Sequence, residues 1–369
     1  MSKSVRGFKW LVSGVLGVSL LGACGAPADT DTPSDVAHEQ AAGDVQVTLS
    51  AATRSFGAKD VAAVTVTYTN VSAQPVQLLR WHVAGQQAIP EGLFTVSRNG
   101  EVVDYMGPHI KRMAPRAEDF IVLDPGQSIT GTALLSGLYD LTRDGLYSVD
   151  FAPVAMSEHS VGLTRGAQLT SGLMTLSIEG RPNVSREFQA MGGTVSAQGV
   201  TAGSNCSSTR STQITTAWTS AKTYASETSS YLNGVASGTA RYTTWFGAYS
   251  STNVATARKH FTNISSALST QAIKVDCGCT ESGTYAYVYP NSPYQIYVCG
   301  AFWSAGNTGT DSKAGTLIHE TSHFTIVAAT DDHVYGQTSA KSLAKSNPTN
   351  ALDNADNHEY EAENTPFQN

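Results

Sequence analysis

Apolar and polar residues alternate along several short segments in the first half of the chain. The clearest of these segments are residues 45–49, 61–69, 76–81, 118–123 and 147–151. Alternation with a period of two predicts strands that bury one face. Turn signals such as Asp124-Pro125-Gly126 separate them, and many short strands between turns are typical of an all-β sandwich of the immunoglobulin-like type. We therefore predict such a domain over residues 45–180.

Helical spacing of apolar residues replaces this alternation in the second half. Residues 212–232 and 254–268 have that spacing, and further helices are expected from Asp311 to about residue 327 and from about 349 to 363. Residues 285–300 indicate an antiparallel hairpin that turns at Asn291-Ser292-Pro293. The prediction for residues 206–369 is an α+β domain, mainly helical, with a small antiparallel hairpin, preceded by a linker over 181–205.

The first 44 residues have the features of a targeting segment. Three basic residues precede an apolar run over residues 10–21, which is too short to cross a bilayer as a helix. Leu21-Gly22-Ala23-Cys24 resembles a bacterial lipobox, which implies removal of residues 1–23 and a lipid on Cys24; an ordinary secretory signal is the alternative. Polar residues 24–44 are expected to form a flexible tether. The chain is thus predicted to be a cell-envelope lipoprotein of the outer membrane or cell surface.

Charge and cysteine content narrow the class of protein. The net charge is −7 without a basic stripe, which argues against nucleic acid as a partner. Apart from Cys24, the four cysteines lie in the C-terminal domain, and an exported protein would oxidise them. Zinc binding by Cys277 and Cys279 is the alternative, but no second C-x-x-C or histidine has the spacing that such a site needs.

The strongest chemical signal is His319-Glu320-Thr321-Ser322-His323, an H-E-x-x-H pattern. On a helix, His319 and His323 share one face and can bind a single Zn²⁺, while Glu320 can act as general base on the metal-bound water. The pattern therefore predicts one zinc ion per domain and hydrolysis of peptide bonds in proteins. An amphipathic helix with two surface histidines is the alternative.

A catalytic zinc also needs a third protein ligand. Ile326 and Ala329 stand where a metzincin requires glycine and histidine, so that class is excluded. A glutamate from a later helix is one remaining solution. The candidates for it are Glu359, Glu361 and Glu363. A nearer solution is the octad Ala329-Thr330-Asp331-Asp332-His333-Val334-Tyr335-Gly336.

This octad resembles the G-T-x-D-x-x-Y-G motif of the aspzincins, the deuterolysin-type metalloendopeptidases, with Ala329 in place of the first glycine. The resemblance implies that Asp332 is the third zinc ligand and that Tyr335 stabilises the tetrahedral oxyanion. From the residues alone, Asp332 in an Asx-turn and Asp331 as the ligand remain alternatives. His333 is expected to be a solvated loop histidine.

Four further segments are similar to the peptidyl-Lys metalloendopeptidase branch of that family. They are residues 242–247, 285–290, 299–303 and 354–360. The resemblance, which covers about residues 206–364, implies disulfides Cys206–Cys277 and Cys279–Cys299. It also implies that Asp356 and Glu359 form an acidic S1′ pocket for lysine, for which a solvated acidic helix is the alternative.

These observations predict a zinc endopeptidase that cuts on the amino side of lysine. The β-sandwich is expected to be a propeptide in which His82, His109 and His159 are structural or solvated. The linker contains no lysine, so an activating protease is expected to cut it, at Arg181 or Arg186, and to free the catalytic domain from the membrane for secretion. The alternatives are a deuterolysin-like peptidase without lysine preference and a surface-anchored binding or adhesion lipoprotein whose peptidase domain is inactive or secondary.

Overall fold

The computed structural model of the chain describes residues 43–153, 169–182 and 199–369. The predicted signal segment, Cys24 and nearly all of the tether lie outside the described residues, as do His159 and Arg186. Among the helices that the structure describes, none combines the length and the apolar character needed to cross a membrane.

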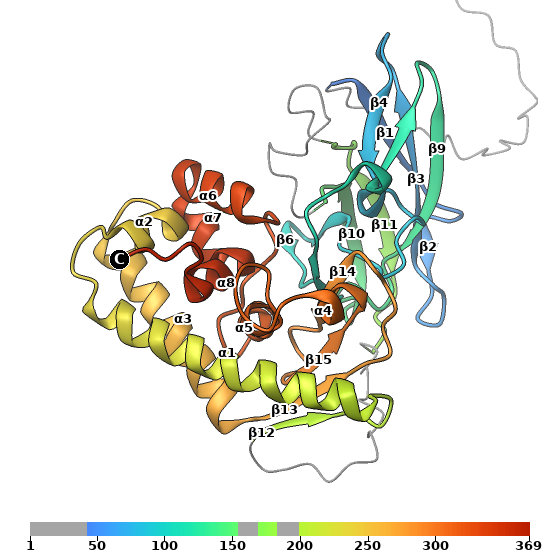
Figure 1. Ribbon diagram of the computed structural model, residues 1–369. Coiled ribbons are helices and arrows are strands. Elements are labelled where there is room, and N and C mark those ends of the chain that lie inside the picture. The colour runs from blue at the N-terminus through green and yellow to red at the C-terminus, as the bar shows by residue number, and fades with distance from the viewer. Residues whose placement is uncertain (1–42, 154–168, 183–198) are drawn as a thin grey trace, which may run out of the picture. The chain divides into compact units, whose positions relative to one another are not determined.

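The N-terminal region is built from strands (Figure 1). They are β1 (Val45–Ser50), β2 (Ser55–Phe56), β3 (Ala63–Asn70), β4 (Val76–Leu79), β5 (Phe94–Arg98), β6 (Glu101–Val102), β7 (His109–Arg112), β8 (Phe120–Leu123), β9 (Ser128–Leu134), β10 (Gly145–Phe151) and β11 (Met174–Ile178). The expected strands are present, although those at 76–81 and 118–123 are shorter than predicted. Their missing ends form 3₁₀ turns at Arg80–His82 and Ala117–Asp119.

Two of the sheets in this region share one apolar core. Their strand orders are β1-β3-β9 and β2-β11-β10-β5-β6, and a separate pair joins β4 to β8. Along β3, buried and half-buried residues alternate, as the sequence pattern predicts. Tyr68 of β3 meets Phe151 of β10 edge-on, with ring centroids 5.4 Å apart, inside the same cluster of buried residues.

The C-terminal region, described over residues 199–369, is mainly helical and contains four strands in that range (Figure 1). Its elements are β12 (Gly199–Ala202), α1 (Ser208–Gly234), α2 (Ala240–Phe246), α3 (Ser251–Thr270), β13 (Ala272–Asp276), β14 (Thr284–Val288), β15 (Gln295–Val298), α4 (Gly300–Ser304), α5 (Lys313–His323), α6 (Gln337–Ser346), α7 (Pro348–Asp353) and α8 (Ala355–Glu363). The helices predicted at 212–232 and 254–268 are α1 and α3. Helix α5 packs between α1 and α8, which places the H-E-x-x-H pattern at the centre of this region.

The sheet of this region is larger than the predicted hairpin. Strands β14 and β15 form that hairpin, but they belong to a mixed sheet of order β12-β13-β15-β14-β7 in which β12, β13 and β15 are parallel. Residues 199–202, which the sequence pattern placed in the linker, form β12 because their backbone pairs with β13. The outer strand β7 comes from the N-terminal region and pairs antiparallel with β14.

Two predicted helix boundaries differ from the structure. Helix α5 is capped by Ser312, whose Oγ accepts the Gly315 N–H at 2.9 Å, rather than by Asp311. The helix expected at 349–363 is divided into α7 and α8 by Asn354, which has an extended backbone. The Asn354 side-chain oxygen accepts the backbone N–H groups of His333 and Val334 at 2.7 and 3.1 Å, so this break holds the loop that follows α5 against α8.

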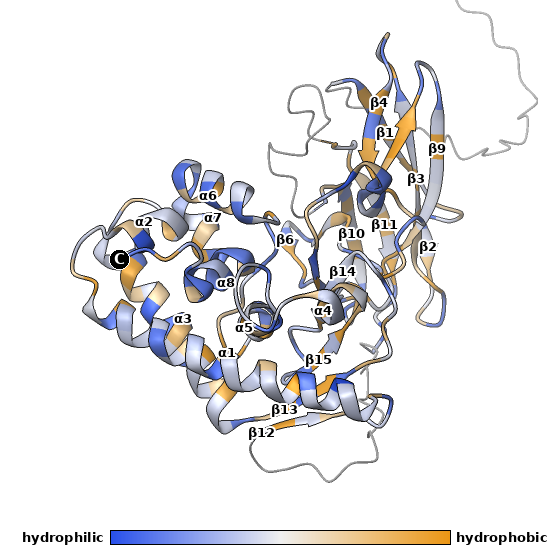
Figure 2. Ribbon diagram, viewed as in Figure 1, coloured by the Kyte–Doolittle hydropathy of each residue, from blue (hydrophilic) through white to orange (hydrophobic). Residues whose placement is uncertain are grey.

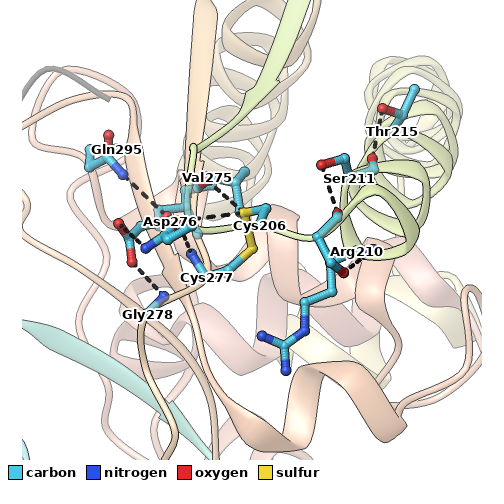
Figure 3. Close-up of a disulfide and its surroundings, with 12 residues drawn as sticks. Cys206, Arg210, Ser211, Thr215, Val275, Asp276, Cys277, Gly278 and Gln295 are labelled. Atoms are coloured by element: carbon cyan, nitrogen blue, oxygen red, sulfur yellow. Dashed lines mark hydrogen bonds between the residues drawn. A yellow bond between two sulfur atoms is a disulfide. The ribbon is translucent and has the colours of Figure 1, made fainter. Parts of the chain in front are cut away.

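Both disulfides join segments of the C-terminal region, with the pairings that the resemblance implies. Cys206–Cys277 connects the start of α1 to the end of β13 across 71 residues (Figure 3). Cys279–Cys299 joins two positions 20 residues apart and precedes α4 directly.

Helix α8 is unusual because it is polar and yet completely buried. Figure 2 colours it as hydrophilic, and all nine of its residues are buried. Burying charged side chains costs free energy unless partners compensate them, so this helix needs partners of opposite charge or a bound cation.

Candidate metal centre and binding cleft

Three buried side chains converge where α5 ends. His319 and His323 lie one turn apart on α5, with ring centroids separated by 4.8 Å. Asp332, from the loop after α5, places Oδ1 3.2 Å from His319 Nε2 and 3.4 Å from His323 Nε2. Ligand atoms that surround one zinc tetrahedrally at about 2.0–2.1 Å lie about 3.4 Å from one another. The spacing therefore fits a zinc ion.

The same three atoms lack other partners. His319 Nε2, His323 Nε2 and Asp332 Oδ1 are buried without a hydrogen-bond partner in the described part of the chain. Burying a polar atom without a partner costs free energy. A bound cation would interact with all three atoms and remove this cost. Burial opposes ionisation of Asp332, but His323 and His319 hold its pKa well below the usual value. Asp332 is therefore a carboxylate, the form that a metal ligand needs.

The other ring nitrogen of each histidine is also held in place. His323 Nδ1 lies 2.7 Å from the carbonyl oxygen of Thr330, and His319 Nδ1 lies 2.9 Å from Asp356 Oδ1. Donation of Nδ1–H to these oxygens leaves each Nε2 lone pair free to face the metal. The structure thus brings together both the candidate ligands and groups that orient them.

Glu320 is a buried carboxyl group beside this centre. Neither of its oxygens has a hydrogen-bond partner among the described residues, and burial raises its pKa to about 7. A carboxyl with a pKa near neutrality can both accept and release a proton. This is the property required of the general base that the H-E-x-x-H pattern predicts.

Strand β7 of the N-terminal region lies across this centre. His109, Ile110 and Lys111 are paired with β14 in antiparallel register. The Ile110 N–H donates to Asp332 Oδ2 at 3.1 Å, and the Tyr335 hydroxyl donates to the Ile110 carbonyl oxygen at 2.7 Å. The β7 backbone therefore contacts both the candidate metal ligand and the candidate oxyanion donor, as an extended peptide in a binding cleft would.

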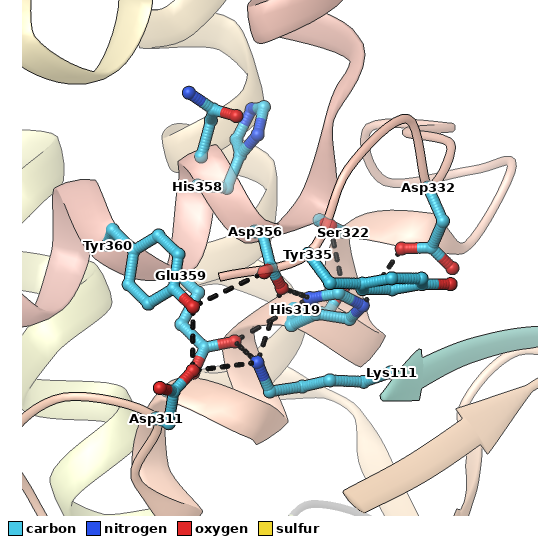
Figure 4. Close-up of polar contacts among 12 residues, drawn as sticks. Lys111, Asp311, His319, Ser322, Asp332, Tyr335, Asp356, His358, Glu359 and Tyr360 are labelled. Atoms are coloured by element: carbon cyan, nitrogen blue, oxygen red, sulfur yellow. Dashed lines mark hydrogen bonds and ion pairs between the residues drawn. The ribbon is translucent and has the colours of Figure 1, made fainter. Parts of the chain in front are cut away.

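Lys111 extends from β7 into a pocket of carboxylates (Figure 4). Its Nζ lies 2.6 Å from Glu359 Oε2, 3.2 Å from Asp356 Oδ1 and 3.6 Å from Asp311 Oδ1, and its side chain is fully buried. The Tyr285 ring lies 5.0 Å away. Burial alone would lower the pKa of Lys111, but Asp356, Glu359 and Asp311 raise it well above the usual value. The pocket therefore holds an ammonium group.

Asp356 connects this pocket to the metal centre. Its Oδ1 contacts Lys111 Nζ and also lies 2.9 Å from His319 Nδ1. Its Oδ2 accepts the Gly336 N–H at 2.7 Å and the Tyr360 hydroxyl at 3.3 Å. Despite burial, Lys111 and His319 lower the pKa of Asp356. One carboxylate thus contacts both a candidate metal ligand and the ammonium group.

The remaining candidates from the sequence lie elsewhere. Glu361 faces Arg241 at 3.3 Å. Glu363 accepts the Ser312 N–H at 2.8 Å at the start of α5. His333 lies 2.8 Å from Asp353 and is half-buried rather than solvated. Neither Glu361 nor Glu363 joins the three side chains that converge at the end of α5.

Three residues of the site were absent from the candidates that the sequence indicated. Lys111 and Asp311 complete the pocket. His109, expected to be structural or solvated, lies beside His323 with ring centroids 4.8 Å apart. No local pattern marks β7 as a strand of this cleft, because its partner strand lies far along the chain.

Comparison with known proteins adds independent information. A family model described as aspzincin M35, lysine-specific metallo-endopeptidase, matches residues 231–363. An extracellular protease of Aeromonas hydrophila is 42% identical over 322 residues, which cover 85% of this chain and 91% of that protein. A peptidyl-Lys metalloendopeptidase of Pleurotus ostreatus is 54% identical over 161 residues, 44% of this chain and 95% of that protein. The solved structure of a zinc peptidase from Grifola frondosa has 49% identity and a TM-score of 0.44, covering 44% of this chain and all 100% of that chain.

Proposed function

The chain belongs to the aspzincin M35 family of metalloendopeptidases, and from that membership we propose that it hydrolyses proteins on the amino side of lysine. The observation that carries the proposal is the position of Lys111. Its ammonium occupies the carboxylate pocket, and the carbonyl of the residue before it accepts the Tyr335 hydroxyl. A substrate bound in the same way would present the peptide bond that precedes its lysine to the metal centre.

The pocket favours lysine for an electrostatic reason. Asp356 and Glu359 are buried, and buried carboxylates without a cation are costly. A lysine side chain removes this cost, whereas a neutral side chain of similar length leaves it in place. Asp311 adds a third carboxylate at 3.6 Å from the ammonium.

The residues of the centre have separable roles in the proposed mechanism. His319, His323 and Asp332 would hold zinc, which supplies polarisation of the scissile carbonyl and a water of lowered pKa when it is bound. Glu320 takes the proton of the attacking water and transfers it to the leaving amine. Tyr335 donates a hydrogen bond to the oxygen that becomes negative in the transition state. Strand β14 binds the substrate backbone in extended form.

We also propose that the N-terminal region is an immunoglobulin-like propeptide that keeps the enzyme latent. Strand β7 pairs with β14 and so occupies the cleft that a substrate needs. This supports a propeptide that covers the active site, and it argues against a permanent adhesion module. Export with a lipid on Cys24, followed by release of the catalytic domain, would place the enzyme outside the cell. This agrees with the similarity to the extracellular protease of Aeromonas hydrophila. Arg181 is only 9% exposed and its guanidinium donates to the Gly57 carbonyl at 3.2 Å. We therefore favour cleavage by an activating protease beyond Arg181.

The test is to incubate the processed protein with a denatured protein substrate, with and without chelator, and to identify the cut sites by mass spectrometry. We expect chelator-sensitive cuts on the amino side of lysine and none from the Glu320→Gln variant. Chelator-sensitive cuts without lysine preference would retain the peptidase and reject the pocket. Absence of cuts from folded, zinc-loaded protein would reject the enzyme and favour a binding protein.

A further inference from the structure

His109, the first residue of β7, lies beside the metal centre. Its side chain is 14% exposed, and its ring centroid is 4.8 Å from that of His323. One potential ligand atom from each of His109, His323 and Asp332 lies within 4.8 Å of the other two. His109 is therefore close to the metal position without belonging to α5 or to its following loop.

The position of His109 is fixed by its neighbours. Its backbone is paired with Val288 of β14, and the next residue, Ile110, donates its N–H to Asp332 Oδ2 at 3.1 Å. A movement of β7 away from the centre would break both contacts. The imidazole of His109 is thus held near the metal ligands by the same backbone that contacts them.

The Nδ1 atom of His109 faces a carboxylate group. His109 Nδ1 lies 3.5 Å from Asp331 Oδ1. Asp331 is itself held, because its N–H donates to the Asp353 carbonyl oxygen at 2.6 Å. Metal-binding histidines almost always direct their other N–H to a carboxylate or a carbonyl, which orients the ring and leaves one nitrogen free for the metal.

We propose that His109 is a fourth ligand of the metal in the full-length chain, an inference that rests on the proposed zinc site but not on lysine preference. With His319, His323 and Asp332 it would complete a closed, four-coordinate set. Closed sites are typical of structural zinc, whereas catalytic zinc keeps one position open for water. The N-terminal region would thus suppress activity twice, since Lys111 fills the pocket and His109 replaces the water that Glu320 must deprotonate.

Counting imidazoles around the bound zinc tests this proposal. The sample is the full-length chain with Glu320→Gln, which prevents self-digestion and leaves all four proposed ligands in place. Extended X-ray absorption fine structure of the zinc-loaded protein should fit three imidazoles and one carboxylate. The His109 ring also lies 5.9 Å from the Tyr105 ring. After the additional change His109→Phe, which keeps an aromatic ring between Tyr105 and His323, the data should fit two imidazoles.

A matched control uses the other histidine of the metal-binding loop. His333 is adjacent to Asp332 but directed to Asp353, so His333→Asn should retain three imidazoles. Loss of one imidazole in the His333 variant but not in the His109 variant would overturn the proposal. Two imidazoles in the parent protein would also overturn it, while the proposed function stands. Absence of bound zinc from the parent protein would overturn both.

A second measurement applies if a variant folds poorly. Altering even the outer-shell partner of a ligand changes metal affinity by about 10–100-fold, so release of zinc to a chelator should be at least about tenfold faster from folded His109→Asn protein than from its parent. Equal release rates would contradict ligation by His109.

Discussion

Replacing Asp356 by asparagine should weaken both zinc binding and lysine selection, because the proposed function assigns a part in both to this carboxylate. Its Oδ1 faces two donors, His319 Nδ1 and Lys111 Nζ, while its Oδ2 accepts from Gly336 and Tyr360. An asparagine would have to direct its NH₂ group towards one of these donor pairs. The substitution therefore removes a charge and introduces a donor–donor contact in a buried position.

The magnitude follows from these contacts. Loss of the outer-shell partner of a ligating histidine lowers metal affinity by about 10–100-fold. Breaking a buried ion pair by removing one partner costs about 3–5 kcal/mol. With a tenfold change for about every 1.4 kcal/mol, the preference for lysine over norleucine at P1′ should fall by at least about 100-fold.

Glu359→Gln is the matched control. Glu359 Oε2 lies 2.6 Å from Lys111 Nζ but 3.6 Å from His319 Nδ1, which is too far for a hydrogen bond. This variant should lose lysine preference and retain the zinc affinity of the parent protein. Comparing the two variants therefore distinguishes an effect on lysine preference from an effect on zinc affinity.

Two assays measure the two effects. Zinc affinity is obtained from competition between the full-length variants and a fluorescent chelator. Lysine preference is obtained from kcat/KM of the processed proteins on peptides that differ only in lysine or norleucine at P1′. Zinc affinity of the Asp356 variant equal to that of the parent would refute the reasoning, and so would equal losses of zinc affinity in both variants.

Three other perturbations give distinct results. Lys111→Met removes the ammonium and leaves the pocket carboxylates unpaired, so β7 should bind the cleft more weakly and unprocessed full-length protein should cleave an added lysine peptide at least about tenfold faster than the parent; no gain would contradict the share of the inhibition that is assigned to Lys111. Tyr335→Phe should lower kcat of the processed enzyme by about 10²–10³-fold with zinc still bound, and an unchanged kcat would exclude Tyr335 as the oxyanion donor. Burial raises the pKa of Glu361 from 4.5 to about 8, so the folded chain retains a proton that the unfolded chain releases. Stability should therefore fall as the pH rises between these values, by up to about 1.4 kcal/mol per pH unit. Glu361→Gln should reduce the pH dependence of stability by this amount in denaturant titrations at pH 5 to 8, and equal pH dependence in the parent and the variant would refute the assignment.

Local patterns were sufficient where the determinants lie close together in the sequence. The H-E-x-x-H pattern places both histidines on one face of α5, because four residues make about one helical turn. The loop that carries Asp332 and Tyr335 follows within a few residues, and the hairpin of β14 and β15 has its turn residues between its strands. Each of these features depends on residues that are close together in the sequence, so a local sequence pattern can predict it.

The contacts made by β7 could not be predicted in this way. Lys111 and Asp356 are separated by 245 positions, and the alternation that marks a strand does not specify which sheet edge it joins. The break at Asn354 was missed for a related reason. It is stabilised by backbone groups of the preceding loop, whereas the residues around it have an ordinary helical composition.

The covalent link between the two regions has a consequence for activation. While the chain is intact, β7 and β14 meet within one molecule, at an effective concentration that no separate peptide would reach. The proposed cleavage of the linker would convert this contact into an ordinary two-component equilibrium, in which the released fragment still binds until it is diluted below its dissociation constant. Cleaved protein that is confined in a small compartment should therefore remain inactive. The same protein should become active once it is diluted into a large volume.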